Sequence, residues 1–507
     1  MGLMDDSRPT GCTDDSNEHA ERFVSALQER GFVVQQGSLR YVDILKLCSE
    51  GKVDSCLGNH AGAPYASYFL PPAPTQDPSE EQEPPVGYDP DDPDNYPANI
   101  DYIGPGFTYK LRPDEAIVMI GRAPPPAYYF GFRSYLGFVQ NKPDKDYSGV
   151  FTVGNDYTGV YHRVWASLGD TLNNFSIWSE GTPRGSPGNP FSSSTIIITT
   201  ADRSVNRQIR SALSAAGFSR DIVNDDNIPP GLANMGLEKG KDTFLFMMRA
   251  AVWADPNVGT DYLSNLDRLV KVFRITPGFP LGNPDPWPVP TLKVKETGTS
   301  EFQVVQNAVG DLDYLRRQIV DRFGGAKFSH VDLTLDDWFE GYEGIALDID
   351  LLADNRDATY VKTNNFQLTT DDDFVVIYGV NHQQIGKATF CNASFYGAEL
   401  RNGVALANIS IAFQGSAADY FPGGYENAKY YYVCKFARKA NADHLVVVVP
   451  YSTGNPSGKA YGVDNNDDLI IGFRSYVDPE AQVGPAPFEL IWDHAILFKR
   501  KRGWRWL

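Results

Sequence analysis

The sequence predicts an α+β protein: a mixed, largely antiparallel α/β domain followed by an all-β sandwich or flattened barrel, with a small N-terminal helical cap. Three observations support this prediction. The chain has 507 residues, and one hydrophobic core rarely serves more than about 300 residues. Aromatic residues at 13%, together with 46 glycines and 35 prolines, favour strands and turns. Short apolar runs separated by turn residues fill the C-terminal third.

Residues 1–70 are predicted to form the helical cap, with two short helices between residues 16 and 51. Ser16 or Asn17 can cap the first helix, which ends at Gly31, and Ser38 can cap the second. Residues 71–99 contain nine prolines and eight acidic residues without any lysine or arginine. This composition opposes regular structure and predicts an extended linker.

Residues 100–277 are predicted to form the mixed α+β domain. One β-turn-α unit is especially clear: Ile196 to Ile198 form a buried strand, Asp202 caps the next helix, and Gly217 ends it. The other predicted strands alternate or are wholly apolar, and they are bounded by turn residues. The six predicted strands are 116–121, 128–138, 159–166, 195–200, 242–253 and 269–276.

A second proline-rich linker, residues 278–298, separates this domain from the rest. The interface helices predicted over 299–343 begin with the clearest of them, residues 301–323. Ser300 and Gln303 have the spacing of a capping box, and Gly324 follows the last apolar position. The position of this helix after the linker predicts that it packs between the two large domains.

Residues 344–499 are predicted to form the β-sandwich-like domain. The clearest hairpin spans 371–397, with Asn381 and His382 in its turn. The basic tail, residues 500–507, is given no functional role. Strands are predicted near Ile345, Phe366, Val375, Thr389, Leu406, Tyr431, Val447, Ile470 and Leu490.

Composition and missing motifs exclude several functions. The formal net charge of -19 opposes nucleic-acid binding, and no apolar run of about 18 residues predicts a transmembrane segment. The chain lacks GxGxxG, GxxxxGK[ST], HExxH and GxSxG, so no organic cofactor is predicted.

The cysteines do not determine whether the protein lies in an oxidising or a reducing compartment. Cys48 with Cys56, and Cys391 with Cys434, could form disulfides if the compartment is oxidising. Few lysines and three Asn-X-Ser/Thr sequons favour a secreted or extracellular protein, with a cytoplasmic location as the alternative. The sequence does not determine the oligomeric state.

Four residues are candidates for catalysis. His382 ends an otherwise apolar row of a predicted strand, and His494 faces inward on another. Arg133 and Arg474 occupy the centre of the pentapeptide Gly-Phe-Arg-Ser-Tyr, which occurs twice, and could bind a ligand carboxylate or phosphate. They lead to a hypothesis: a cofactor-independent hydrolase or lyase whose site near the domain interface uses histidine acid/base chemistry.

A group of carboxylates gives the alternative hypothesis. Asp348, Asp350, Asp354 and Asp357 could supply oxygen ligands to Ca²⁺, although a charged strand edge would have the same composition. The chain would then be an extracellular β-sandwich protein that binds a glycan or a protein, with calcium as a cofactor. The expected ligand is a small molecule or a glycan, and the second hypothesis also allows a partner protein.

Overall fold

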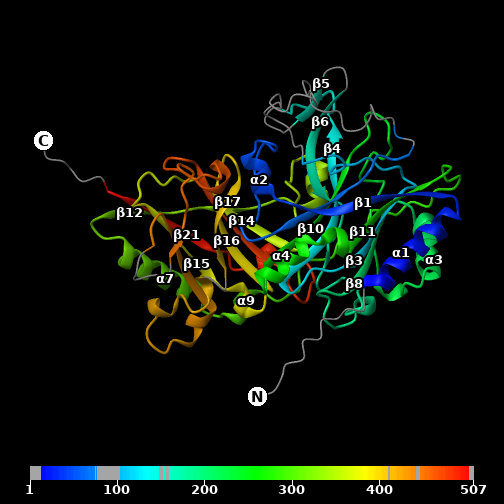
Figure 1. Ribbon diagram of the computed structural model, residues 1–507. Helices are drawn as coiled ribbons and strands as arrows, with labels where there is room; N and C mark the ends of the chain where they lie inside the picture. Colours follow the sequence, from blue (N-terminus) through cyan, green and yellow to red (C-terminus); the bar gives the residue numbers. More distant parts are fainter. Residues whose placement is uncertain are drawn as a thin grey trace, which may run out of the picture.

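The structure is a computed structural model that describes residues 13–74, 76, 103–147, 152–155, 159–408, 412–440 and 446–501. Most of the predicted linker 71–99 and most of the basic tail 500–507 lie outside the described residues, as does Cys12. The fold is α+β, as predicted, and consists of an N-terminal unit and a β-sandwich that lie next to each other (Figure 1).

An 11-stranded sheet forms the body of the N-terminal unit. All its paired strands are antiparallel except β8 and β9, which are parallel. Strands predicted from apolar runs, such as β3, β8 and β10, are confirmed. In sheet order, the strands are β5 (Thr152–Asn155), β6 (Gly159–Ser167), β4 (Ala127–Gln140), β10 (Phe244–Trp253), β2 (Tyr65–Phe69), β1 (Phe32–Val42), β11 (Val270–Pro277), β3 (Ala116–Arg122), β8 (Ser194–Thr200) and β9 (Val223–Asn227), with β7 (Leu172–Asn173) paired to β4.

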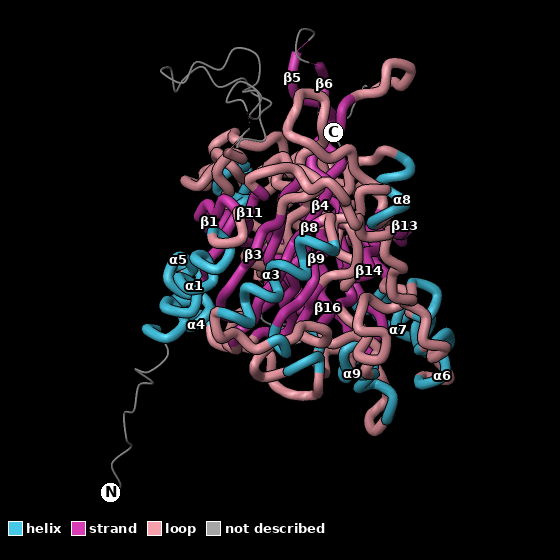
Figure 2. Tube along the Cα trace, turned by 90° about the vertical axis from the view of Figure 1, so that its right-hand side faces the viewer, coloured by secondary structure: helices cyan, strands magenta, loops and turns pink. Residues whose placement is uncertain are grey.

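Alternating side chains give this sheet two apolar faces. Ile196 and Ile198 of β8 pack under α1 (Thr13–Gln28) and α3 (Arg203–Ala215), whereas Ile197 faces the second core on the opposite side. Figure 2 shows α3 in front of β8 and β9. Asp202 caps α3 as predicted, accepting hydrogen bonds from the backbone N–H groups of Ser204 and Val205. Two further helices, α4 (Pro256–Ser264) and α5 (Leu266–Leu269), precede β11.

The segment predicted to be a helical cap contributes two central strands. β1 pairs with β11 through its first half and with β2 through its second half, so Phe32–Val42 is extended along its whole length. The second helix of this segment is therefore short, α2 (Ile44–Ser49), and its cap is Asp43 rather than Ser38. The local sequence favours a helix here, but the segment pairs as a strand with residues more than 200 positions away. Sequence periodicity does not reveal such distant pairing.

The second unit contains two five-stranded sheets, and we call it the sandwich. Its core lies between the sheets and includes Ile377, Phe395 and Phe473. One sheet contains, in order, β12 (Phe328–Asp332), β21 (His494–Arg500), β15 (Phe374–Val380), β18 (Tyr431–Ala437) and β19 (Val446–Val448); the other contains β13 (Leu335–Asp337), β14 (Ala358–Thr363), β20 (Leu469–Tyr476), β16 (Phe390–Gly397) and β17 (Asn402–Asn408).

The predicted hairpin at residues 371–397 is wrong. β15 and β16 lie in different sheets, and α9 (His382–Ile385) connects them across the edge of the sandwich. Each strand has a neighbour on both sides within its sheet and is buried along its whole length. Two adjacent apolar strands predict a short connection, but they do not reveal which strands they pair with.

The helix predicted over 301–323 is also placed differently. It is interrupted, with α6 (Glu301–Val304) and α7 (Ala308–Phe323) separated by a short break. Leu312, Leu315 and Ile319 of α7 pack on the outer face of the sandwich, against Val376 and Phe498. The helix therefore covers a sheet of the second unit and does not join the two units. The strand expected near Ile345 is instead a helix, α8 (Gly341–Leu347).

Candidate functional site

A cavity of about 350 Å³ lies where the N-terminal unit meets the sandwich. Residues of β2, β4 and β10 line it from one side, and residues of β14, β16 and β20 line it from the other. Its volume falls in the range of small-molecule sites. We call it the junction cavity. Its lining includes five tyrosines and three arginines: Tyr65, Tyr129, Tyr360, Tyr396, Tyr476, Arg249, Arg401 and Arg474.

Arg249 enters the junction cavity from β10 of the N-terminal unit. Its Nη2 donates to the backbone carbonyl of Ala353, and its Nε lies 3.4 Å from Sδ of Met247. Its guanidinium also lies 5.4 Å from the ring centre of Tyr135. No carboxylate of the described residues forms an ion pair with it. The positive charge is thus held by a carbonyl, a thioether and aromatic rings.

Arg474 enters from β20 of the sandwich and is 9% exposed. Its Nη1 donates to the Tyr396 hydroxyl at 2.5 Å, and its Nη2 donates to the Gly58 carbonyl at 2.7 Å. Its guanidinium carbon also lies 5.5 Å from the ring centre of Tyr360. In the described part of the chain it, too, has no carboxylate partner. Two buried or half-buried cations therefore face one cavity without counter-ions.

Asp354 is an acidic residue of the lining, and its oxygens are already engaged. They accept hydrogen bonds from the backbone N–H of Ser167 at 2.7 Å, from the Ser167 hydroxyl at 2.8 Å and from the backbone N–H of Gly341 at 2.8 Å. Burial raises the pKa of Asp354. The carboxylate thus fixes two backbone segments and does not neutralise the arginines.

His60 is a buried histidine of the lining. Its Nδ1 accepts from the backbone N–H of Gly62 at 3.0 Å, and its Nε2 lies 2.9 Å from the side-chain amide of Asn392. Burial and the neighbouring Arg474 hold the pKa of His60 well below its ordinary value. Both ring nitrogens thus lie within hydrogen-bonding distance of nitrogen atoms of the protein. Neither nitrogen is left free to take a proton from a ligand.

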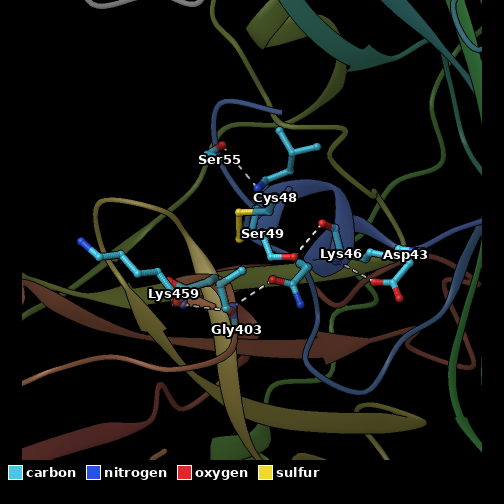
Figure 3. Close-up of a disulfide and its surroundings, with 12 residues drawn as sticks. Asp43, Lys46, Cys48, Ser49, Ser55, Gly403 and Lys459 are labelled. Atoms are coloured by element: carbon cyan, nitrogen blue, oxygen red, sulfur yellow. Dashed lines mark hydrogen bonds between the residues drawn. A yellow bond between two sulfur atoms is a disulfide. The ribbon is translucent and has the colours of Figure 1, made fainter. Parts of the chain in front are cut away.

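The loop that contains His60 comes directly after a disulfide in the chain. Figure 3 shows this disulfide and its surroundings. Cys48 and Cys56, one of the two pairs that the sequence left open, are bonded, and Cys391 and Cys434 are free. After the disulfide, the Gly58 carbonyl holds Arg474, and the Asn59 side chain accepts from the backbone N–H of Gly403 in β17. The loop from the N-terminal unit is thereby fastened to the sandwich.

The predicted catalytic residues do not converge on one site. Only Arg474 lines the junction cavity. Arg133 is buried and paired with Asp226 at 2.7 Å. His494 stacks on Tyr378, with ring centres 5.0 Å apart, and burial lowers its pKa.

His382 is buried between two carboxylates. Its Nδ1 lies 2.6 Å from Glu301 and its Nε2 lies 3.5 Å from Asp493, which also accepts from the Tyr432 hydroxyl. Burial alone would disfavour the charged ring, but the two carboxylates outweigh it and raise the pKa of His382 well above its ordinary value. His382 thus attaches the start of α6 to the sandwich, and its role as acid or base stays a prediction.

The four aspartates predicted to bind calcium each have different protein partners. Asp348 accepts from His162 at 2.6 Å and from Tyr147 at 2.9 Å, Asp350 pairs with Arg163, and Asp357 accepts from Tyr129 at 2.8 Å. Within the described residues, no group of three His, Cys, Asp or Glu side chains is arranged to hold a metal ion. Calcium binding stays a prediction and would require these contacts to open.

Sequence reasoning missed Arg249 and His60. Arg249 carries a signal in retrospect, because it is a charged residue in the apolar strand Phe-Leu-Phe-Met-Met-Arg-Ala-Ala-Val-Trp. A charge in such a strand needs a partner or a ligand. His60 lies in an irregular loop, and no local pattern distinguishes it.

Comparisons with known proteins leave the function open. No known protein family, curated protein or solved structure matches this chain. No helix in the described ranges is long and apolar enough to cross a membrane.

Proposed function

We propose that this protein binds a small organic anion in the junction cavity. The observation that carries the proposal is the pair Arg249 and Arg474, which face the cavity without a carboxylate partner. Leaving a buried cation without a counter-ion is costly. The chain has 64 acidic residues, yet none of those described is paired with either arginine. An anionic ligand would supply the missing charges through both guanidinium groups.

Binding is better supported than histidine-dependent hydrolysis or elimination. His60 has both ring nitrogens engaged and a lowered pKa. Burial raises the pKa of Tyr360 and of Tyr476, so neither hydroxyl is a base near neutral pH. The hypothesis of a hydrolase or lyase needs a general base in reach of the ligand, and neither His60 nor these two hydroxyls supports that role.

We also propose that the protein is extracellular. The Cys48–Cys56 disulfide supports this location because disulfides persist in oxidising compartments. The proposal is nearest to the hypothesis of an extracellular glycan- or protein-binding protein drawn from the sequence, without calcium as a requirement.

The test is calorimetric titration of the wild-type protein with a panel of small organic carboxylates. Arg249→Met and Arg474→Met should each weaken binding at least about tenfold, since a charged hydrogen bond contributes about 1.5–3 kcal/mol. Arg316→Met is the matched control, because Arg316 pairs with Asp332 outside the cavity and its loss changes the net charge equally. Equal losses in the control and the cavity variants, or no binding by any anion, would contradict the proposal.

A further inference from the structure

We infer that the anion is an acidic saccharide, meaning a sugar that carries a carboxylate on its ring. This inference rests on the proposed function and narrows it to one ligand class. It depends on three properties of the junction cavity: its size, the aromatic surface of its walls and the hydrogen-bonding groups that the protein itself leaves unused.

The size excludes a bare inorganic anion as the natural occupant. A cavity of about 350 Å³ leaves most of its space empty around a sulfate or phosphate ion. A phosphate group would also favour the N-terminus of a helix. Helix α2 begins in the lining at Ile44, but Asp43 already caps it by accepting from the backbone N–H of Lys46. The anion would therefore be bound by the guanidinium groups of the arginines, whose planar geometry matches a carboxylate.

The aromatic walls suit the apolar face of a sugar ring. Tyr129, Tyr396 and Tyr476 are buried and line the cavity from both units. Trp338 is 37% exposed at the lining, and Lys362 lies over its ring at 5.8 Å. Aromatic side chains of this kind combine an apolar surface with a polar edge, as a sugar combines C–H faces with hydroxyl groups.

Unused polar groups distinguish a sugar from an aromatic acid. The hydroxyls of Tyr360 and Tyr476 have no hydrogen-bond partner among the described residues, and only the oxygen of the Asn59 amide is engaged. A sugar would pair these groups with its own hydroxyls. A flat aromatic carboxylate would fill the same space and leave them unpaired, and unpaired buried polar groups weaken binding.

The experiment compares four probes by titration calorimetry: a galacturonate disaccharide, the matching neutral galactose disaccharide, benzoate and inorganic phosphate. The galacturonate disaccharide should bind at least about tenfold more tightly than each of the other three. Tyr476→Phe removes one unused hydroxyl and keeps the ring, so it should weaken galacturonate binding several-fold and leave benzoate binding unchanged. Tyr314→Phe is the control, because Tyr314 belongs to α7 and lies outside the cavity.

The outcomes separate the two proposals. If benzoate binds as tightly as the galacturonate disaccharide, or if Tyr476→Phe weakens both equally, the saccharide inference is overturned and the organic-anion site stands. If phosphate binds most tightly, or if no anionic probe binds, both proposals are overturned. If the neutral disaccharide binds as well as the acidic one and Arg474→Met has no effect, the arginines have no role in recognition and both are again overturned.

Discussion

Arg133 and Arg474 occupy the same position in a repeated pentapeptide, but their environments are opposite. Arg133 is neutralised by Asp226 at 2.7 Å and belongs to the packed interior. Arg474 donates to a tyrosine hydroxyl and a carbonyl, and it faces the junction cavity. The pentapeptide alone could not separate these roles, because the difference comes from partners that are distant in the sequence.

His382 gives a prediction at the same scale. His382→Gln should destabilise the fold by about 3 kcal/mol at pH 6, since removing one member of a buried charge cluster leaves the others uncompensated. The pKa of His382 in the folded state is raised, so its stabilising contribution is complete below the unfolded-state pKa of about 6.5. The contribution is then lost as the pH rises through the folded-state pKa.

The measurement is urea unfolding of both proteins at pH 6 and at pH 9. The difference in unfolding free energy between wild type and His382→Gln should shrink at the higher pH. A difference that is the same at both pH values would mean that the charge of His382 does not stabilise the fold.

At the scale of elements, the sequence predicted where strands and helix caps occur better than it predicted which elements pack against each other. The apolar run Ile196 to Ile198 in β8 and the Asp202 cap of α3 are local signals, and both are confirmed. The partners of β15 and β16 depend on residues far along the chain, so their assignment to one hairpin was wrong. The stripe Leu312, Leu315 and Ile319 correctly predicted a packed helix face, but it carried no information about which surface that face covers.

The disulfide loop gives the prediction for an element. Cys48→Ser combined with Cys56→Ser should cost about 2.5 kcal/mol of stability, as expected for closing a loop of this length. The same change should weaken anion binding, because Gly58 and Asn59 hold Arg474 and β17 directly after the disulfide. Thermal unfolding and calorimetry on the double variant measure the two effects.

The control for the loop is Cys391→Ser, which removes a free cysteine outside the lining. It should leave anion affinity unchanged. If the double variant is less stable but binds the anion as well as wild type, the disulfide supports the fold without shaping the cavity.

At the scale of the whole molecule, buried polar groups of one unit find their hydrogen-bond partners in the other unit. Asp357 of the sandwich accepts from Tyr129 of β4 and from Asn173 of β7, both at 2.8 Å. Burial raises its pKa to about 7. The junction cavity has the same origin, since Arg249 and Arg474 lie in different units. Such a site could not be predicted from one sequence because no local pattern states how two units pack.

Asp357 makes the joining of the units depend on pH. The folded state keeps the proton that the unfolded state releases near pH 4, so Asp357 makes stability fall as the pH rises from about 4 to about 7. Asp357→Asn removes this titration and should relieve on the order of 2 to 4 kcal/mol of that loss. Urea unfolding of both proteins at pH 4.5 and pH 8 measures it; a variant that loses as much stability as wild type over this interval would contradict it.

The pairing of β1 with β11 has a consequence for synthesis on the ribosome. Phe32 pairs with Pro277, and β11 in turn pairs with β3. The centre of the large sheet therefore stays incomplete until most of the N-terminal unit has been translated and released from the exit tunnel. Until then, the first half of β1 presents an unpaired edge, which is prone to aggregation. Nascent chains that end before β11 should need chaperone binding, whereas longer ones can close the sheet.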